Sequence, residues 1–260
     1  MTLSRRSSLK ARLRNFEPLL GTFLRTPSIH VCEILSRAPL DVVCIDAEHA
    51  PFGPFEIDAC AFALRASDMP NLVRVPAFTP ASVLQALDSG ATGILVPHVT
   101  TVTQAHAIVR AAHFGPGGRG YAGSTRAGNY SGKTMAENLA DGTASTAIIA
   151  QIEDVEALDA LEGIAAVDGI DCLFVGRMDL TVALGAQSPD DQKVIDAVKR
   201  VCQVGRKHGR AVGMFVPNVE DVAMWVREGA SFFLLASDQV LMLQGARDLG
   251  AAFNTAISKP

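Results

Sequence analysis

Apolar and polar residues follow two alternating patterns along the chain. Short, continuous apolar runs recur at intervals, and such runs are typical of parallel β-strands buried on both faces. The segments between them repeat their apolar residues at helical spacing, as Val194, Val198 and Val201 do. We therefore expect strands at 19–24, 41–46, 71–76, 93–99, 147–153, 172–176, 211–216 and 232–237.

The helical segments complete a repeated strand–helix order. At the N-terminal end, Leu9 and Leu13 share one face of an expected surface helix. Near the C-terminal end, Asn218 and Asp238 are expected to cap two helices at their N-termini. The expected helices cover about 7–16, 154–166, 190–208, 218–229 and 239–254.

About eight strand–helix units in roughly 250 residues predict a (β/α)₈ barrel, the TIM barrel, as a single domain over residues 1–260. A doubly wound open sheet is the alternative. It would leave strands unplaced, and no G-x-G-x-x-G follows the first strand. The segment 113–132 is long for a connection inside a compact domain, so we expect it to be functional or mobile.

The composition narrows the class of protein. Hydrophobic residues make up 48% and charged residues 19%, and a net charge of −4 gives no basic face for nucleic acid. No apolar run approaches the roughly 20 residues of a membrane-spanning helix. The cysteines are odd in number and scattered, which predicts buried, reduced thiols and a cytoplasmic location; they are Cys32, Cys44, Cys60, Cys172 and Cys202.

Polar residues gather where the expected strands end. A TIM barrel carries its active site at the C-terminal ends of its strands, so these residues are expected on one rim. His98 is interpreted only as an ordinary loop histidine. The residues at the strand ends are Asp46, Glu48, His49, Arg74, His98, Gln151, Glu153 and Asp179.

Gln151 and Glu153 are two residues apart and therefore share one face of a strand. A carboxylate held inside the barrel mouth needs a cation, because an unpaired buried charge is costly. Asp179, after the next strand, could share that cation, and two carboxylates with waters suit Mg²⁺ or Mn²⁺. The alternative is that Glu153 and Asp179 are acids at helix N-termini, stabilised by the helix dipole.

Arg74 and the pair Asp46 and His49 each allow two interpretations. Arg74 lies between two valines, and it either forms a structural salt bridge or faces a substrate oxygen that becomes negative. Asp46 could hold Nδ1–H of His49 and leave Nε2 as a base near neutral pH. The alternative for His49 is an ordinary loop histidine.

Schiff-base chemistry requires a lysine that reaches the barrel interior. No lysine falls in an expected strand, which excludes that chemistry. The ends of the last two strands, "VPNVED" and "ASDQV", lack the glycine-rich turns of a phosphate site, which disfavours sugar phosphates and flavins. The lysines are Lys10, Lys133, Lys193, Lys199, Lys207 and Lys259.

Several motifs occur in an order that resembles the HpcH/HpaI aldolase family, the metal-dependent class II pyruvate aldolases. They are "IDAEHAPFG", "VRVP", "ALDSGATGILVPHV", "GGRGYAGSTRAGNY", "QIED" and "FVGRMDL". The resemblance runs from about residue 19 to about 250. It implies a TIM barrel and a homo-oligomer, hexamer or trimer, whose last helix swaps between subunits. It also implies reversible cleavage of a 4-hydroxy-2-oxo acid to pyruvate and an aldehyde through a metal-stabilised pyruvate enolate.

The resemblance assigns roles around the expected metal. Glu153 and Asp179 would bind the divalent ion, Mg²⁺ or Mn²⁺ with Co²⁺ as a further option. Gln151 would contact the keto-acid end of the substrate. The main-chain amides of Met178 and Asp179 would bind its carboxylate, and Glu48 would hold a metal-bound water.

The resemblance also assigns the acid–base residues. Arg74 would stabilise the enolate oxygen, and His49 would be the base, acting through a water. Asp46 matches the acid beside that histidine. Asp88 matches a further acid that would raise the basicity of His49, across a subunit contact.

The chain departs from the family pattern at two places. The usual G-P-x-D before the metal aspartate reads "GRMD", so Arg177 and Met178 stand at the mouth of the barrel, and Phe23 stands where the family tends to carry tryptophan. The departures leave two alternatives to the aldolase open. One is a metal-free condensation like that of siderophore citrate synthases, and the other is a non-catalytic barrel that binds a keto acid.

Overall fold

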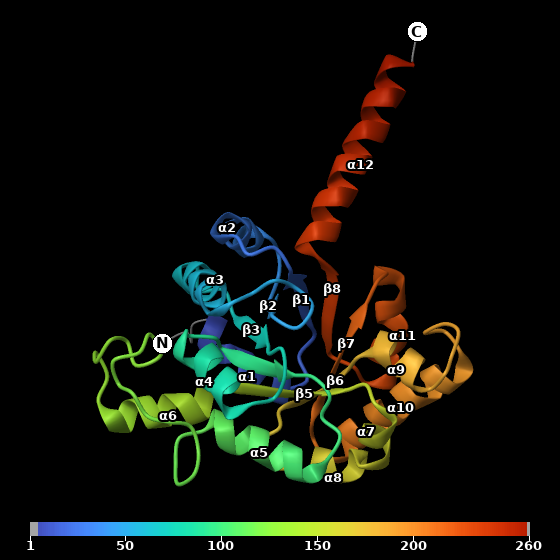
Figure 1. The fold of residues 1–260 in the computed structure, drawn as a ribbon. Coiled ribbons are helices and arrows are strands. Elements are labelled where there is room, and N and C mark those ends of the chain that lie inside the picture. The colour runs from blue at the N-terminus through green and yellow to red at the C-terminus, as the bar shows by residue number, and fades with distance from the viewer. Residues whose placement is uncertain (1–4, 259–260) are drawn as a thin grey trace.

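The computed structural model describes residues 5–258, except for the side chain of Ser7, and confirms the predicted TIM barrel (Figure 1). Eight parallel strands pair in chain order, and β1 closes the barrel against β8. The strands are β1 (Leu19–Leu24), β2 (Val42–Asp46), β3 (Asn71–Arg74), β4 (Gly93–Val96), β5 (Ala147–Ile152), β6 (Cys172–Val175), β7 (Ala211–Val216) and β8 (Phe232–Ser237).

Helices surround the barrel and close one of its ends. The helix expected over 154–166 is two helices, because the turn breaks at Ala160. No individual ranges were predicted for α2 to α6 or for α9, although the alternative interpretation of Asp179 as an acid at a helix N-terminus agrees with its place in the first turn of α9. The described helices are α1 (Arg5–Arg14), α2 (Ile29–Arg37), α3 (Pro54–Ala66), α4 (Pro80–Asp88), α5 (Val102–Ala112), α6 (Met135–Ser145), α7 (Val155–Asp159), α8 (Leu161–Ala166), α9 (Arg177–Ala183), α10 (Gln192–Lys207), the short 3₁₀ helix η1 (Val219–Asp221), α11 (Val222–Glu228) and α12 (Asp238–Ile257).

The strands separate two apolar layers, which explains why their hydrophobicity is continuous rather than alternating. Val43 and Ile45 of β2 pack in the outer layer against helices, whereas Val42 and Cys44 belong to the interior cluster. Leu9 and Leu13 of α1 join the interior cluster, so this amphipathic helix closes the N-terminal end of the barrel. The other interior residues are Leu19, Phe23, Leu72, Leu95, Ala147, Ile149, Cys172, Phe174, Ala211, Phe232 and Leu234.

The inward-facing positions change from apolar to polar at the C-terminal ends of the strands. Because alternate residues of a strand share a face, Asp46 follows Cys44 inward and Arg74 follows Leu72. Gln151 and then Glu153 continue the inward face of β5, as the spacing predicts. The barrel interior is therefore mainly apolar in the middle and carries a layer of polar side chains at the C-terminal ends of the strands.

The last helix projects away from the barrel (Figure 1). Its N-cap is Ser237, whose hydroxyl accepts from Val240 N at 3.4 Å, and not Asp238 as expected. Asp238 is the first helical residue, and its carboxylate accepts from the main-chain amides of Arg25 (2.7 Å) and Thr26 (3.2 Å). The expected cap at Asn218 also differs: it precedes η1 and makes no side-chain capping bond.

Several further expectations concern residue chemistry. All five cysteines are free and buried, as predicted. Within residues 5–258 no lysine lies in a strand, and Lys259 lies outside the described residues. The described part of the chain contains no helix with the length and apolar character needed to cross a membrane.

A glycine at the start of β4 lets two strands approach closely. A Cβ on Gly93 would collide with the carbonyl oxygen of Ala147 and lie 2.8 Å from its Cβ. We expect Gly93→Ala to lower the free energy of unfolding by about 1–3 kcal/mol, the cost of overpacking a core. Urea unfolding measures it. The control Gly120→Ala, with no atom within 4 Å of its Cβ, should stay within about 1 kcal/mol of the parent. Equal effects would contradict the close approach.

Candidate active site

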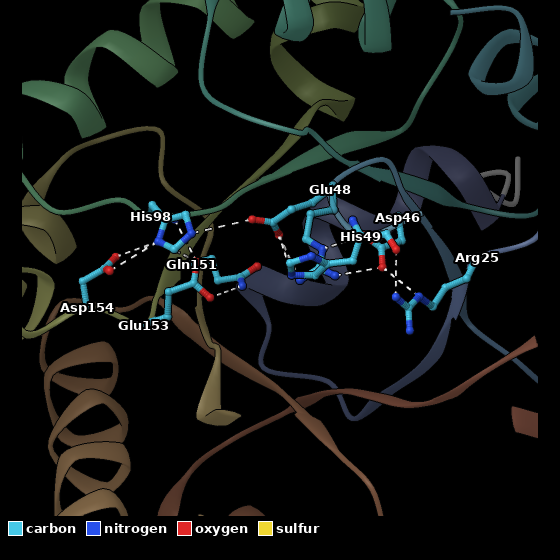
Figure 2. A network of polar contacts seen from close by, with 9 residues as sticks. Arg25, Asp46, Glu48, His49, His98, Gln151, Glu153 and Asp154 are labelled. Atoms are coloured by element: carbon cyan, nitrogen blue, oxygen red, sulfur yellow. Dashed lines mark hydrogen bonds and ion pairs between the residues drawn. The ribbon is translucent and has the colours of Figure 1, made fainter. Parts of the chain in front are cut away.

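A cavity of about 350 Å³ opens at the C-terminal ends of the strands. Polar side chains from several strand ends meet beside it and form a row of contacts that runs across the barrel mouth (Figure 2). The apolar part of its wall includes Phe23, Phe174 and Phe215. The polar residues that line it are Arg25, Asp46, His49, Arg74, Gln151, Arg177, Asp179 and Ser237.

The buried pair of Arg74 and Asp46 lies at the centre of this rim. The two residues are register partners at the ends of β3 and β2, and they form a two-pronged contact, Nε to Oδ1 at 3.0 Å and Nη2 to Oδ2 at 2.9 Å. Burial lowers the pKa of Arg74, but the hydrogen bond and charge of Asp46 outweigh it and raise the pKa above its ordinary value. The guanidinium also lies 4.6 Å from the centroid of the Phe23 ring. Arg74 therefore stays a fixed positive charge, with Nη1 directed to Glu48 at 3.1 Å.

Asp46 does not hold the His49 ring as the sequence suggested. Its Oδ1 accepts from the main-chain N–H of His49 at 3.1 Å, because the chain turns back immediately after β2. The imidazole is instead 52% exposed, and its Nε2 lies 3.7 Å from Oε2 of Glu48. Asp46 thus fixes the backbone of His49 and the side chain of Arg74, while the ring faces the open rim.

Glu153 is a buried carboxylate with both oxygens directed. Oε1 accepts from the main-chain N–H of His98 at 2.9 Å, and Oε2 accepts from the side-chain amide of Gln151. A Cβ at Gly176 would collide with that second oxygen, so the glycine leaves the space that Glu153 occupies. Burial raises the pKa of Glu153, and the charge of Asp179 adds to the rise.

Sequence reasoning missed His98, which the structure brings into the site. Its ring lies 3.7 Å from Glu48, 3.5 Å from Glu153 and 3.1 Å from Asp154. One atom each of Glu48, His98 and Glu153 falls within 4.8 Å of the others, a grouping that could hold a metal ion. The residue has a φ of 52°, in the left-handed region, so the inward–outward alternation of β4 does not extend to it. The signal available in the sequence was Pro97, which directly follows β4 and lacks the N–H needed to continue the strand pairing, so His98 need not keep the strand alternation.

Asp179 and Met178 lie in the first turn of α9, beside the cavity. The first amides of a helix have no partner within the helix and remain free to bind an anion. Burial is the main reason why the pKa of Glu48 is raised, and the charge of Asp179 adds to the rise. The charge of Asp179 therefore raises the pKa of both Glu48 and Glu153, and the charges of Arg74 and His98 oppose this rise at Glu48.

Arg177 is largely committed to contacts with the later helices. Its guanidinium lies 5.0 Å from the ring centroid of Trp225, and Nη2 lies 3.2 Å from the carbonyl oxygen of Pro189 and 3.3 Å from Asp190. The side chain is buried at the cavity wall. The residue that departs from the family pattern thus ties α9 to α11 and to the loop before α10.

Asp88 lies at the opposite end of the barrel. It is the last residue of α4, before β4 begins, and its carboxylate pairs with Arg119 of the 113–132 segment. Helices of the barrel run antiparallel to the strands, so the end of α4 lies at the N-terminal rim. Within one chain Asp88 is therefore separated from His49.

A model of the HpcH/HpaI aldolase/citrate lyase family matches residues 19–244. The chain belongs to this family. The recognition from the ordered motifs is confirmed, and the chain is an aldolase-type lyase.

Relatives of the HpcH/HpaI family match along nearly the whole chain. The hydroxypyruvate/pyruvate aldolase of Paraburkholderia phytofirmans is 33% identical over 249 residues, which cover 92% of this chain and 94% of the relative. The crystal structure of a family protein from Burkholderia cenocepacia has a TM-score of 0.90 at 34% identity, covering 95% of this chain and 99% of that one. The citrate synthase SbnG shares the fold with a TM-score of 0.84 at 29% identity, over 97% and 98% of the two chains.

The contact between His98 and Asp154 generates a testable prediction. Burial lowers the pKa of His98, but the hydrogen bond to Asp154 and the charges of Glu153, Asp154 and Glu48 raise it above its ordinary value of 6.5. In chelator-treated protein, Asp154→Ala should lower the His98 pKa, measured by NMR of the imidazole. Asp159→Ala, on the surface of α7, is the control.

The same contact affects stability with a defined sign. Because the folded-state pKa of His98 is the higher one, the contact stabilises the protein below the unfolded-state pKa. That stabilisation is lost as the pH rises through the folded-state value.

A His98 titration that is the same in the parent and in Asp154→Ala would show that the carboxylate does not act on this ring.

Proposed function

We propose that the protein catalyses divalent-metal-dependent, reversible cleavage of a 4-hydroxy-2-oxo acid into pyruvate and an aldehyde. The observation that carries this proposal is the convergence of Glu153, Glu48 and Asp179 beside a fixed arginine. The substrates are small molecules, which suits a cavity of about 350 Å³. Aldolase activity of relatives, including one named for hydroxypyruvate and pyruvate, supports the choice.

The donor set fits a divalent cation. Buried carboxylates with raised pKa values repel one another, and a cation among them would remove both the repulsion and the burial penalty. Glu153 and Asp179 would hold the ion, as the family resemblance implies, although the three ligand atoms that the structure brings within 4.8 Å belong to Glu48, His98 and Glu153 and not to Asp179. Oxygen-rich ligands favour Mg²⁺ or Mn²⁺, with Co²⁺ as a further option. When bound, the ion would supply Lewis-acid polarisation of the keto acid.

The remaining groups bind and orient the substrate. The amide of Gln151 and the free main-chain amides of Met178 and Asp179 would bind the keto-acid end. The guanidinium of Arg74 would face the C2 oxygen, where negative charge develops, and Asp46 would keep it there. His49 would take the C4 hydroxyl proton through a water, because its ring is half exposed and the residue lines the cavity.

Bond cleavage then follows from these positions. As the C4 hydroxyl loses its proton, the C3–C4 bond breaks, the aldehyde forms at C4, and the electron pair passes to the C2 oxygen as pyruvate enolate. Protonation of C3 gives pyruvate.

We propose that Asp88 supports His49 only from a neighbouring subunit, because its own barrel separates the two.

A citrate synthase-like condensation is the second candidate, because the structure of SbnG is similar over nearly the whole chain. It predicts turnover of oxaloacetate with an acetyl thioester that chelators leave unchanged. Glu48 and Glu153 favour the aldolase, because burial raises the pKa of both in spite of their contacts with Arg74 and His98, and a divalent ion would offset that burial penalty.

Removal of the metal or of Glu153 should stop enolate formation. The protein with Mg²⁺ or Mn²⁺ should exchange the methyl protons of pyruvate for deuterium, followed by ¹H NMR. EDTA, or Glu153→Gln, should reduce the rate by on the order of 100-fold or more, since a preorganised charge at the reacting oxygen is lost. Glu156→Gln, exposed on α7, is the matched control.

The outcomes of this exchange measurement separate the hypotheses. Exchange that persists after thorough chelation would sink the metal assignment. Binding of pyruvate with neither exchange nor turnover would support the non-catalytic barrel. Chelator-insensitive formation of citrate would support the second candidate.

We propose that the protein is a homo-oligomer, hexamer or trimer, in which α12 packs on a neighbouring subunit. Leu249, Phe253 and Ile257 recur at helical spacing on α12, and all three are exposed in the single chain. An apolar stripe of this kind on a projecting helix is costly in water unless another surface covers it. A cytoplasmic location is part of the proposal, on the basis of five free, buried thiols.

Charge added to the apolar stripe should weaken the assembly. Leu249→Asp together with Phe253→Asp should shift the mass measured by light scattering towards the single chain, since each buried large side chain contributes about 1.5–3 kcal/mol. Asn254→Asp places the same charge on a polar position of α12 and should leave the mass unchanged. An unaltered mass in the double variant would remove α12 from the interface.

A further inference from the structure

Arg25 is an unassigned arginine at the mouth of the barrel. It follows β1 on the same inward face as Phe23, and it lines the cavity beside Asp46 and His49. Figure 2 shows it at one end of the polar row, next to Asp46. Its Nη2 donates to the main-chain carbonyl of His49 at 2.8 Å, and its Nε lies 3.3 Å from Oδ2 of Asp46.

These contacts hold the backbone of His49 from both sides. Asp46 accepts its N–H at 3.1 Å, and Arg25 donates to its carbonyl oxygen. The imidazole itself is half exposed, and its Nε2 lies 3.7 Å from Oε2 of Glu48. The direction of the ring therefore depends on how firmly the main chain of residue 49 is fixed.

Arg25 is itself anchored from the other end of the chain. Asp238, 2% exposed, accepts from the main-chain amides of Arg25 and Thr26 at 2.7 and 3.2 Å. The side-chain amide of Gln239 donates to the carbonyl of Arg25 at 3.4 Å. A buried carboxylate bound by two amides is a strong, directional contact. The start of α12 thus fixes the residue that fixes His49.

We propose that Arg25 is a positioning residue for the base His49, and that Asp238 acts on the base through Arg25. The inference rests on the proposed function of His49 as the base of the cleavage reaction. Partly exposed ion pairs contribute little to folding stability, and Arg25 is 38% exposed. Removal of its side chain should therefore affect the placement of the base far more than the free energy of unfolding.

Steady-state kinetics of cleavage test the proposal on the metal-loaded protein. With a 4-hydroxy-2-oxo acid as substrate, Arg25→Ala should lower kcat by roughly 10- to 100-fold with little change in KM, since small misplacement of a reacting group costs up to about 100-fold. Asp238→Asn should also lower kcat, as Arg25→Ala does. Arg37→Ala, an exposed arginine on α2, is the matched control and should behave as the parent.

A double-mutant cycle shows whether Arg25 acts through His49. In the His49→Ala background, Arg25→Ala should cause no further loss of kcat, because the group that it positions is gone. Additive losses, or a change confined to KM, would overturn the proposal and indicate that Arg25 contacts the substrate directly.

Amide hydrogen exchange gives a readout that needs no turnover. Arg25→Ala and Asp238→Asn should speed exchange in the segment 46–53, while the urea midpoint of the barrel stays close to that of the parent. Unchanged protection there would overturn the proposal. If the parent protein neither cleaves the substrate nor exchanges pyruvate protons, the proposed function fails and the inference fails with it. If the parent is active and the variants match the parent, only the inference fails.

Discussion

The buried pair of Asp46 and Arg74 is the contact on which the rim depends. Charges removed from water must be paired, and these two residues meet because they are register partners at the ends of adjacent strands. The pair commits one guanidinium edge and leaves Nη1 for Glu48. It also leaves Asp46 able to accept from the His49 amide. One ion pair thereby orients an arginine, a glutamate and the backbone of the proposed base.

The position of Glu153 depends on the alternation of inward and outward residues along β5 and on the absence of a side chain at Gly176. Glu153 points inward because it continues the face of Ile149 and Gln151, and Gly176, which follows β6, leaves the room that it needs. A carboxylate in that position carries a burial penalty, which the neighbouring Asp179 increases. The barrel mouth therefore holds a buried carboxylate at Glu153 and a fixed guanidinium at Arg74, with Glu48 in contact with the guanidinium.

The fold and the inward residues could be predicted because they follow from local periodicity. Continuous apolar runs gave the strands of the barrel, and spacing by two placed Gln151 and Glu153 on the inner face. Other features depend on backbone geometry that periodicity does not encode. The left-handed φ of His98 turns it towards Glu48 and Glu153, and the carboxylate of Asp238 binds a distant loop rather than capping its own helix. The position of Asp88 at the opposite rim follows from the three-dimensional course of α4, which the motif in the sequence does not contain.

The joint at Ser237 and Asp238 serves two parts of the molecule at once. Ser237 caps the start of α12, and Asp238 accepts from the main-chain amides of Arg25 and Thr26 in the loop after β1. Two events that share such a joint are thermodynamically linked, and the linkage is reciprocal. A ligand at the barrel mouth and a partner surface on α12 that favour the same geometry of this joint would therefore change each other's binding free energy by the same amount.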